Sequence, residues 1–589
     1  MQTTATREEQ LLAQMTLAEK IGQMTQVEKN SITPKEIAEH HIGSILSGGG
    51  GNPAVNNGKN WLEMVNTYLA AAQHSRLGIP VLYGVDAVHG HSNVVGATMF
   101  PHNVGLGATR DADLVRRIGR ATAVEVAATG VRWDFAPAVS VSKDVRWGRA
   151  FESYSENVEV VTELGKAYIE GLQGDDLSQP TGVLPSVKHF VADGGTAWMT
   201  PEPKYDWIPG YWEQKDGRFS LDQGIADIDE ATLRQEHLPP YIAAIEAGAL
   251  NIMVSYSSWG GLKMHTQTYL LTDVLKGELG FEGFLVTDWL AIDQIDPDYY
   301  TAAVQAINAG LDMVMVPYEW KRFIDCVTRA VESGDIPLAR IDDAVRRILK
   351  AKVALGLFDA PLQDGVLLPQ MGCAAHRQIA REAVQKSAVL LKNDGQLLPL
   401  AKETSTLFVA GQAADDIGLC CGGWTVNWMG GEGAITPGTT ILQGIEALVS
   451  AETAVSYAPD GSFDSETKAE VGIVVLNEYL YVEGYGDRPD MHLPEADVAL
   501  LERVGAQCEK LVVILISGRP LLITDHLPKA DAWVAAWLPG TESYGVADVI
   551  FGDVPFTGKL SFTWPRTAAD FPQAGQTGTA VLFPFGHGL

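Results

Sequence analysis

The stretch Gly283-Phe-Leu-Val-Thr-Asp-Trp289 has the pattern of a short buried strand that ends on a carboxylate and an indole. In a barrel of parallel strands, residues at the C-terminal strand ends face the active site, so an aspartate there is a candidate catalytic group. An aspartate after a strand is also a common N-cap of the next helix. We take Asp288 as a candidate nucleophile and use the rest of the chain to decide between the two interpretations.

Short apolar runs of the same kind recur through the N-terminal half, and helical patterns lie between many of them. The candidate strands cover residues 43–46, 80–86, 132–139, 185–190, 251–257, 284–289 and 312–316. Repeated strand–helix units that close on themselves form a barrel. The sequence therefore predicts an α/β fold in which residues 1–357 form a (β/α)8-type barrel. Only seven strands are visible, which is also compatible with an irregular barrel.

A second domain is expected after the barrel. Helix-stopping residues in Leu355-Gly-Leu-Phe-Asp-Ala-Pro361 predict a linker over 358–372. Runs rich in Val, Ile and Leu are typical of parallel strands that are covered on both faces. Five such runs follow, at 388–391, 406–410, 471–476, 511–517 and 532–537. We expect residues 373–589 to form an α/β sandwich domain with a mostly parallel sheet and a C-terminal extension.

Length and charge restrict the possible functions. A chain of 589 residues exceeds what one hydrophobic core usually supports. Its net charge of −30 opposes binding to nucleic acid and to anionic membranes, whereas a neutral sugar is indifferent to it. The five cysteines are few, odd in number and scattered, which favours neither a disulfide framework nor a zinc site.

The N-terminus of the given chain lacks the basic and apolar segments of a signal peptide. No apolar run reaches the roughly 20 residues that cross a bilayer. The default expectation is a cytoplasmic protein, or a periplasmic or secreted one if a leader has been removed.

Polar residues end several of the predicted strands and would meet at one mouth of the barrel. Asp86 closes one run, Lys188 and His189 lie in another, and Arg146 lies in Asp144-Val-Arg-Trp-Gly-Arg149. Such groups can hold vicinal hydroxyls of a sugar through charge-assisted hydrogen bonds. Taken singly, each has an ordinary structural alternative, such as a cap, an ion-pair partner or a core histidine.

Five motifs together resemble those of glycoside hydrolase family 3, above all its β-glucan exohydrolases and exo-acting β-glucosidases. They are Asp86-Ala-Val-His-Gly-His91, Phe100-Pro-His-Asn-Val-Gly-Leu-Gly-Ala-Thr-Arg110, Arg146-Trp-Gly-Arg149, Lys188-His-Phe190 and Thr287-Asp-Trp289. The resemblance implies that Asp288 forms a covalent glycosyl intermediate and that no cofactor or metal takes part. It also implies a sugar-binding set made of Asp86, Arg146, Lys188, His189, Tyr256 and Trp289.

Two stretches of the second domain add to this resemblance. In Asn477-Glu-Tyr-Leu-Tyr-Val-Glu-Gly-Tyr-Gly-Asp487 the family pattern places the general acid/base at Glu483, with Glu478 as the competitor. In Cys421-Gly-Gly-Trp-Thr-Val-Asn-Trp428 it places a sugar-stacking indole at Trp424, which would face Trp289 as a clamp. The alternative for Trp424 is a core tryptophan.

The family resemblance implies a retaining enzyme that releases glucose from the non-reducing end of β-glucosides and β-gluco-oligosaccharides. The small-molecule substrate would be its partner, and the sequence leaves the oligomeric state open. A β-xylosidase of the same family and a catalytically silent carbohydrate-binding protein remain as alternatives. An N-acetylglucosaminidase is disfavoured, because Val191-Ala-Asp-Gly-Gly195 replaces the histidine-containing loop of that branch.

Two loops carry weaker expectations. The aromatic-rich segment 198–219 is expected to line the entrance for an oligosaccharide or to pack against a neighbouring domain or subunit. The glycine run 47–51 lacks the continuation of a phosphate-binding loop and is expected to form a turn or a site of close substrate approach.

Overall fold

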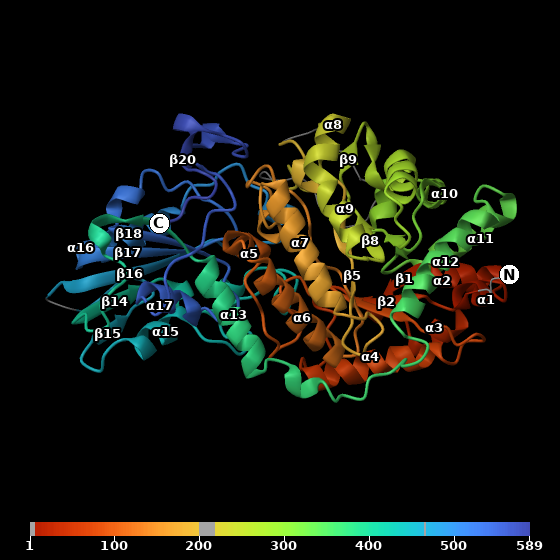
Figure 1. Cartoon of the computed structure of the whole chain (residues 1–589), viewed down its shortest axis with the longest axis horizontal. Helices are drawn as coiled ribbons and strands as arrows, with labels where there is room; N and C mark the ends of the chain where they lie inside the picture. Colours follow the sequence, from red (N-terminus) through yellow and green to blue (C-terminus); the bar gives the residue numbers. More distant parts are fainter. Residues whose placement is uncertain (1–5, 199–217, 465–466) are drawn as a thin grey trace.

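The computed structural model describes residues 6–198, 218–464 and 467–589. Two units lie side by side in it (Figure 1). A strand-and-helix barrel occupies the right of the view, and a domain built on one sheet occupies the left.

The barrel is a ring of parallel strands that follow one another in chain order. Its strands among the described residues are β1 (Thr25–Glu28), β2 (Ser44–Ser47), β3 (Leu82–Val85), β4 (Trp133–Asp134), β5 (Leu184–Pro185) continued by β6 (Val187–Phe190), β8 (Asn251–Val254), β11 (Phe284–Val286) and β12 (Val314–Met315). Parallel pairing joins β12 to β1 and then runs to β5, while β6, β8 and β11 form a second parallel ladder. A parallel bridge between Val286 and Met313 closes the ring. The predicted barrel is therefore confirmed.

Strand β1 is the one that the apolar pattern did not reveal. Its sequence, Thr-Gln-Val-Glu, has a single apolar side chain, yet all four residues are buried. Gln26 donates a hydrogen bond to the Ser44 hydroxyl at 2.9 Å, and the Thr25 hydroxyl donates to the Ile21 carbonyl at 2.8 Å. Buried polar groups are tolerated when they are paired in this way.

Helices surround the ring and follow the strands in alternation. They are α3 (Pro34–Glu39), α4 (Gly58–Ala72), α5 (Asn103–Thr109), α6 (Ala112–Ala128), α7 (Val158–Gln173), α9 (Pro239–Glu246), the π-helix Tyr269–Glu278, α10 (Tyr299–Ala309), α11 (Trp320–Ser333) and α12 (Leu338–Ala354). Helix α12 shows why they dock. Its residues Ile341, Val345, Ile348 and Leu349 are buried at the spacing of one helical face.

The second unit contains a six-stranded sheet in the order β13-β18-β17-β16-β14-β15. These strands are β13 (Val389–Asn393), β14 (Thr406–Ala410), β15 (Ala454–Tyr457), β16 (Ala469–Asn477), β17 (Cys508–Ile516) and β18 (Ala532–Trp537). Of these six described strands, β13 alone runs antiparallel to its neighbour. The predicted mostly parallel sheet is confirmed, and the additional strand β15 is a short edge strand with alternating exposure.

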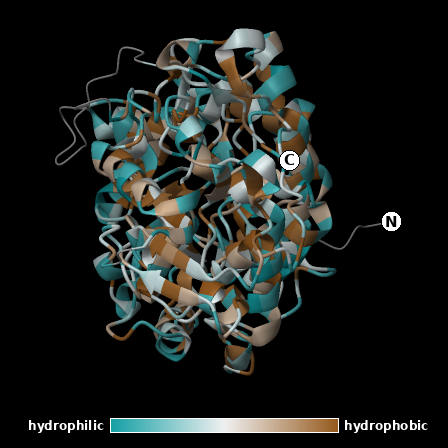
Figure 2. Ribbon diagram, turned by 90° about the vertical axis from the view of Figure 1, so that its left-hand side faces the viewer, coloured by the Kyte–Doolittle hydropathy of each residue, from teal (hydrophilic) through white to brown (hydrophobic). Residues whose placement is uncertain are grey.

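Helices α13 (Ala374–Ser387), α15 (Ile441–Leu448), α16 (Glu495–Ala506) and α17 (Tyr544–Ile550) pack around this sheet. Apolar ribbon segments lie mainly inside the molecule and hydrophilic ones mainly outside (Figure 2). None of the helices in the described ranges combines the length and the apolar character that a bilayer crossing needs. All five cysteines are free thiols.

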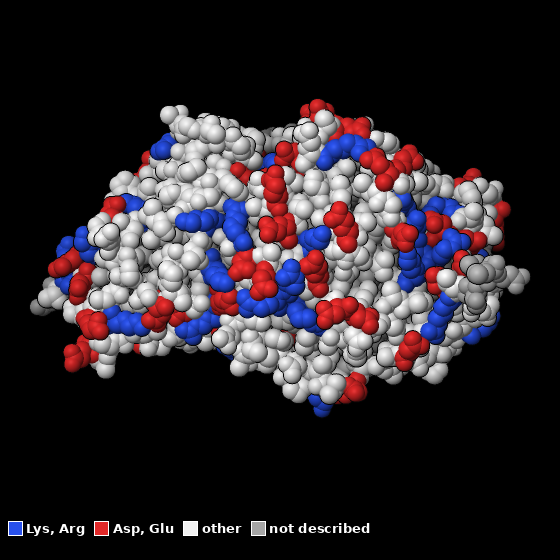
Figure 3. Space-filling model, viewed as in Figure 1, with Lys and Arg blue, Asp and Glu red and all other residues white. Residues whose placement is uncertain are grey.

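Helix α13 joins the two units because it packs against α5 and α6 of the barrel. Ion pairs span this contact, with Arg117 bound to Glu382 at 2.8 Å and Lys386 bound to Asp111 at 2.8 Å. Acidic and basic side chains are interspersed over this face of the molecule (Figure 3). The stretch 358–372 between α12 and α13 holds only a short 3-10 turn, Leu368–Gln370. Its role as the domain boundary stays a prediction.

Candidate active site

A cavity of about 400 Å³ opens at the C-terminal ends of the barrel strands, and both units contribute to its walls. The barrel supplies the floor and most of the lining, whereas Trp424, Trp428 and Glu483 come from the second unit. The lining residues are Glu28, Asn30, Leu46, Gly48, Gly49, Gly50, Gly51, Asp86, Phe135, Arg149, Lys188, His189, Met253, Tyr256, Asp288, Trp289, Met315, Tyr318, Trp424, Trp428 and Glu483.

Asp288 follows β11 and faces this cavity. The next short helix, Ala291–Gln294, has Leu290 at its N-cap position, so Asp288 is not a helix cap. The Trp289 backbone N–H donates to Asp288 Oδ1 at 2.7 Å, and His189 Nε2 lies 3.7 Å from Oδ2. Burial raises the pKa of Asp288 to about 6, although Arg149 and Lys188 favour the charged form. At pH 7 most of this carboxyl group is ionised.

Glu483 enters the same cavity from the loop after β16. Its Oε1 lies 3.7 Å from an Arg149 guanidinium nitrogen. Burial raises the pKa of Glu483 to about 8; Arg149 opposes this shift, and the carboxylates of Asp222 and Asp288 add to it. At pH 7 most of this group is protonated.

The competing glutamate, Glu478, is held elsewhere. It is not among the lining residues, and its carboxylate pairs with Arg519 at 3.1 Å and accepts the Tyr481 hydroxyl at 3.0 Å. Of the two candidates that the sequence offered, only Glu483 faces the cavity.

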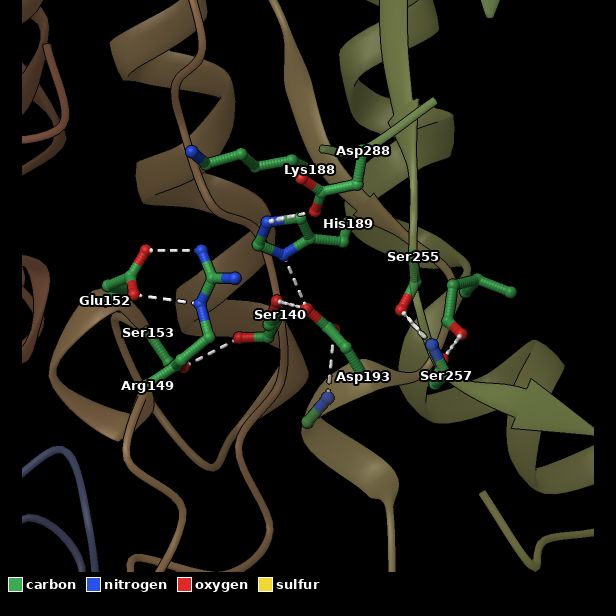
Figure 4. A network of polar contacts seen from close by, with 12 residues as sticks. Ser140, Arg149, Glu152, Ser153, Lys188, His189, Asp193, Ser255, Ser257 and Asp288 are labelled. Atoms are coloured by element: carbon green, nitrogen blue, oxygen red, sulfur yellow. Dashed lines mark hydrogen bonds and ion pairs between the residues drawn. The ribbon is translucent and has the colours of Figure 1, made fainter. Parts of the chain in front are cut away.

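Two of the predicted sugar-binding residues, Lys188 and His189, lie beside Asp288 in a network of polar side chains (Figure 4). The Lys188 ammonium donates to Asp86 Oδ1 at 3.0 Å. His189 Nδ1 lies 2.8 Å from Asp193 Oδ2, an oxygen that also accepts the Ser140 hydroxyl at 2.6 Å. Burial holds the pKa of His189 well below its usual range, so this ring is neutral at pH 7. The site therefore offers neutral and charged hydrogen-bonding groups side by side.

Tyr256 lies beside Trp289, the tryptophan that follows strand β11. Its hydroxyl donates to the Trp289 carbonyl at 2.5 Å, and both side chains line the cavity. Trp289 in turn contacts Tyr318 edge-to-face, with ring centroids 5.6 Å apart. These contacts fix the outer wall on the barrel side.

Arg146 is not among the residues that line the cavity, and its predicted role in sugar binding stays a prediction. Asp144, two residues earlier, binds its guanidinium and its backbone N–H at 2.5–3.1 Å. The guanidinium packs over the Trp198 ring at 4.4 Å. The arginine in the cavity wall is Arg149, three residues later, whose fork binds Glu152 through two bonds of 2.9 Å.

Trp424 and Trp428 of the second unit both line the cavity, and the clamp of Trp424 with Trp289 stays a prediction. Trp424 is 8% exposed, its indole N–H donates to Glu152 at 3.2 Å, and Lys188 lies 5.5 Å from its ring centroid. Trp428 is half-buried at the rim. A Cβ on Gly48 would lie 3.1 Å from the Trp289 ring, and one on Gly49 would lie 2.7 Å from Trp428 Cβ.

Gly48 thus approaches the Trp289 ring, and Gly49 approaches the Cβ and backbone of Trp428. This placement favours Trp428 as the partner of Trp289 and makes Trp424 part of the inner wall. It also assigns the glycine run to close approach, since a side chain on Gly48 or Gly49 would collide with Trp289 or Trp428.

Comparison with known proteins agrees with this architecture. Residues 16–200 and 209–351 match the glycosyl hydrolase family 3 N-terminal domain, and residues 388–589 match the glycosyl hydrolase family 3 C-terminal domain. The chain belongs to glycosyl hydrolase family 3. It is therefore a glycoside hydrolase, as the sequence motifs implied.

The relatives of this family 3 enzyme include proteins named as glucosidases, a xylosidase and a glucanase. The chain is 32% identical to the lysosomal beta glucosidase of Dictyostelium discoideum, over 98% of the chain and 75% of that protein. It is 31% identical to a beta-xylosidase of Formosa agariphila, over 88% of the chain and 76% of that protein. The crystal structure of a mutant of the exo-1,3/1,4-beta-glucanase (ExoP) from a Pseudoalteromonas species superposes with a TM-score of 0.91 at 39% identity, over 99% and 94% of the two chains.

Several lining residues of the family 3 cavity were not singled out from the sequence. Glu28 ends β1 and Asn30 follows it, and no signal in the sequence pointed to them because β1 was not recognised; Tyr318 follows β12, a predicted strand, so its position was the available signal. Arg149 was visible only as part of a motif. The central part of the predicted entrance loop, 199–217, lies outside the described residues.

Proposed function

We propose that this family 3 enzyme is a retaining, exo-acting β-glucosidase or β-glucan exohydrolase. It would release glucose from the non-reducing end of β-glucosides and β-gluco-oligosaccharides. One observation carries the proposal: two carboxyl groups face one cavity with pKa values of about 6 for Asp288 and about 8 for Glu483. Glycoside hydrolysis needs one ionised and one protonated carboxyl group at the same sugar, and the family resemblance supports the retaining form of this chemistry.

The reaction follows from these two protonation states. The Asp288 carboxylate attacks the anomeric carbon, and Glu483 donates its proton to the departing glycosidic oxygen. Glu483, now ionised, removes a proton from the incoming water, which attacks the anomeric carbon and releases Asp288. Arg149 lies beside Glu483 and would stabilise the carboxylate that forms when the proton leaves.

The shape of the cavity supports exo action. Apolar side chains at the ends of the barrel strands close its floor, namely Leu46, Phe135, Met253 and Met315. Asp86, Lys188 and His189 surround the space above them and can bind the hydroxyls of one terminal sugar. A chain end fits such a closed floor, whereas the interior of a polysaccharide does not.

The identity of the released sugar has one specific alternative to glucose, which is xylose. A beta-xylosidase is among the relatives of comparable identity, and a xylosyl unit lacks only the hydroxymethyl group of glucose. One such group is worth about 10–200-fold in a closed pocket. Hydrolysis of matched nitrophenyl β-glucosides and β-xylosides distinguishes the two, and a higher kcat/KM on the xyloside would assign the enzyme to the second class.

The roles of the two carboxyl groups are tested by substitution. We expect Asp288→Asn to lower kcat by about 10⁴-fold or more, because no nucleophile remains. Glu483→Ala should keep activity on an aryl glucoside whose leaving group needs no proton, and azide should accelerate it and give β-glucosyl azide. Formation of α-glucosyl azide from Glu483→Ala would contradict the retaining assignment. Product analysis on laminari- and cello-oligosaccharides should show glucose released singly.

A further inference from the structure

The backbone around Glu483 is pressed against a loop of the barrel. Glu483 itself has φ = +47°, a left-handed conformation that a residue with a side chain keeps only when its surroundings impose it. A Cβ on Gly148 would lie 1.8 Å from the Glu483 carbonyl oxygen, so the two backbones touch there. The residue after Gly148 is Arg149, which contacts the Glu483 carboxyl group.

Asp487 ties this loop to the barrel from one side. Its carboxylate is 1% exposed and accepts three backbone N–H groups, each at 2.7 Å. The donors are Gly148, Leu221 and Asp222, and all three belong to the barrel chain segment. The contact is strengthened nearby, where the Phe219 N–H donates to the Gly484 carbonyl at 2.9 Å.

Arg519 ties the same loop to the barrel from the other side. Its side chain is fully buried and donates to the Gly486 carbonyl at 2.7 Å and to Glu478 at 3.1 Å. It also donates to three consecutive barrel carbonyls, those of residues 145–147, at 3.1–3.3 Å. A planar guanidinium with five donors can make such a divergent set of bonds, and an ammonium cannot.

We propose that Asp487 and Arg519 form an interdomain latch that sets the position of Glu483 over the sugar. Both are positioning residues, because they act through the backbone of residues 483–487 and do not line the cavity. This inference rests on the proposed function of Glu483 as the acid/base. A proton donor works only within hydrogen-bonding reach of the departing oxygen, and a displacement of about 1 Å can cost about 10²-fold in rate.

The test compares two substrates that differ in their need for the acid. Dinitrophenyl β-glucoside has a leaving group that departs without a proton, whereas laminaribiose needs one. In Asp487→Asn the amide cannot accept all three backbone donors. We expect kcat/KM on laminaribiose to fall about 100-fold and kcat/KM on the dinitrophenyl glucoside to change by less than about 3-fold. Azide should accelerate turnover of the dinitrophenyl glucoside by this variant.

A second variant covers the case in which Asp487→Asn fails to fold. Arg519→Lys keeps the charge beside Glu478 and loses the bonds to the barrel carbonyls, and the same selective loss on laminaribiose is expected. The matched control is Glu125→Gln. Glu125 of the barrel is 1% exposed, accepts the Thr98 backbone N–H at 2.9 Å and lies 2.7 Å from Nδ1 of His376 in α13, so it is a buried contact between the units and is not among the lining residues of the cavity.

The control should lower the melting temperature without changing the ratio of the two kcat/KM values. Equal losses on both substrates in the latch variants, or an unchanged ratio, would overturn the latch while leaving the proposed function intact. A wild-type enzyme that hydrolyses neither glucoside would overturn the proposed function and the latch with it.

Discussion

Asp288 and Glu483 carry the same functional group, and their surroundings put them in different protonation states. Both are desolvated by burial, but Asp288 accepts a backbone N–H and has Lys188 nearby, whereas Glu483 has the carboxylates of Asp222 and Asp288 near it. A nearby negative charge raises the pKa of a carboxyl group, and a hydrogen bond donated to the ionised form lowers it. The division of roles therefore follows from local electrostatics.

The first prediction is the pH dependence of kcat/KM. Asp288 must be ionised, so activity should fall as the pH drops through about 6. Glu483 must be protonated, so activity should also fall as the pH rises through about 8. The resulting bell is measured with an alkyl or disaccharide substrate. On dinitrophenyl β-glucoside the alkaline limb should weaken, and an alkaline limb of equal size on both substrates would contradict the role of Glu483.

The second prediction concerns Trp428. We expect Trp428→Ala to lower kcat/KM for a β-linked glucose disaccharide by about 10-fold, which corresponds to about 1.4 kcal/mol of lost stacking. β-Glucosyl fluoride has no second ring and should be unaffected. Tyr269→Ala, which removes an exposed aromatic side chain outside the cavity, serves as the control. If Trp428→Ala left both substrates unchanged, Trp289 would have no partner there.

At the scale of single residues, the sequence predicted which catalytic residues face the cavity better than it predicted which neighbours each side chain binds. Asp86 and Asp288 follow strands β3 and β11, and Lys188 and His189 lie within β6, and barrel strands have a fixed direction. Arg146 lies in a turn, where the direction of a side chain depends on neighbours such as Asp144 that no periodicity reveals.

Among the elements, the glycine run after β2 has the most direct influence on the cavity. Gly48 lies against the Trp289 ring and Gly49 lies against the Cβ and backbone of Trp428, so neither position has room for a side chain. The run could be placed on a turn from its composition, but its contact with Trp428 arises from docking of the second unit. Strands β1 and β15 could not be recognised from an apolar run. Strand β1 is mostly polar although it is buried, because its polar side chains form hydrogen bonds within the barrel, and β15 is a half-exposed edge strand.

The third prediction follows from this run. Gly49→Ala places a methyl group 2.7 Å from Trp428 Cβ and 2.9 Å from its Cα, so the indole or the loop must move. We expect kcat/KM on disaccharides to fall by at least about 10-fold, with a smaller effect on β-glucosyl fluoride. Gly505→Ala in α16 is the matched control, because its new Cβ would meet only the end of the Leu511 side chain at 3.3 Å.

A Gly505→Ala chain should keep full activity and gain up to about 1 kcal/mol in stability, since alanine favours a helix interior. Wild-type kinetics in Gly49→Ala would show that the loop absorbs the methyl group without moving Trp428.

On the scale of the whole molecule, buried and exposed contacts between the two units are expected to contribute differently to the free energy of unfolding. Glu156 is 7% exposed, and its carboxylate accepts the Thr563 N–H at 2.9 Å, the Thr563 hydroxyl at 2.6 Å and the Gln573 amide at 3.2 Å. Glu382 instead pairs with Arg117 and Lys386 at the surface. Of these two carboxylates, only that of Glu156 leaves buried hydrogen-bond donors without an acceptor when it is removed.

The fourth prediction compares these two carboxylates. Glu156→Leu should lower the free energy of unfolding by about 2–4 kcal/mol, because buried hydrogen-bond donors lose their acceptor. Glu382→Gln should change it by less than about 1 kcal/mol, as is usual for exposed ion pairs. Urea denaturation followed by circular dichroism measures both values. Equal effects of the two substitutions would contradict the view that the buried network holds the units together.

The two-unit construction was predictable from the interruption of the strand–helix pattern near residue 360, whereas the docking of the units was not. Docking depends on contacts such as those of Glu156 and Asp487, which join residues more than 250 positions apart. Local periodicity contains no information on such pairs.

The distribution of the site over two units separates two kinds of selectivity. In the proposed reaction Asp86, Lys188 and His189 bind the terminal ring, and all three precede residue 290, so these glycone contacts are encoded in the barrel. In the same proposal Trp428 and Glu483 contact the departing group, and both are encoded after residue 420. Substitutions in the later segment can therefore retune the range of aglycones without disturbing recognition of the sugar that is cleaved off.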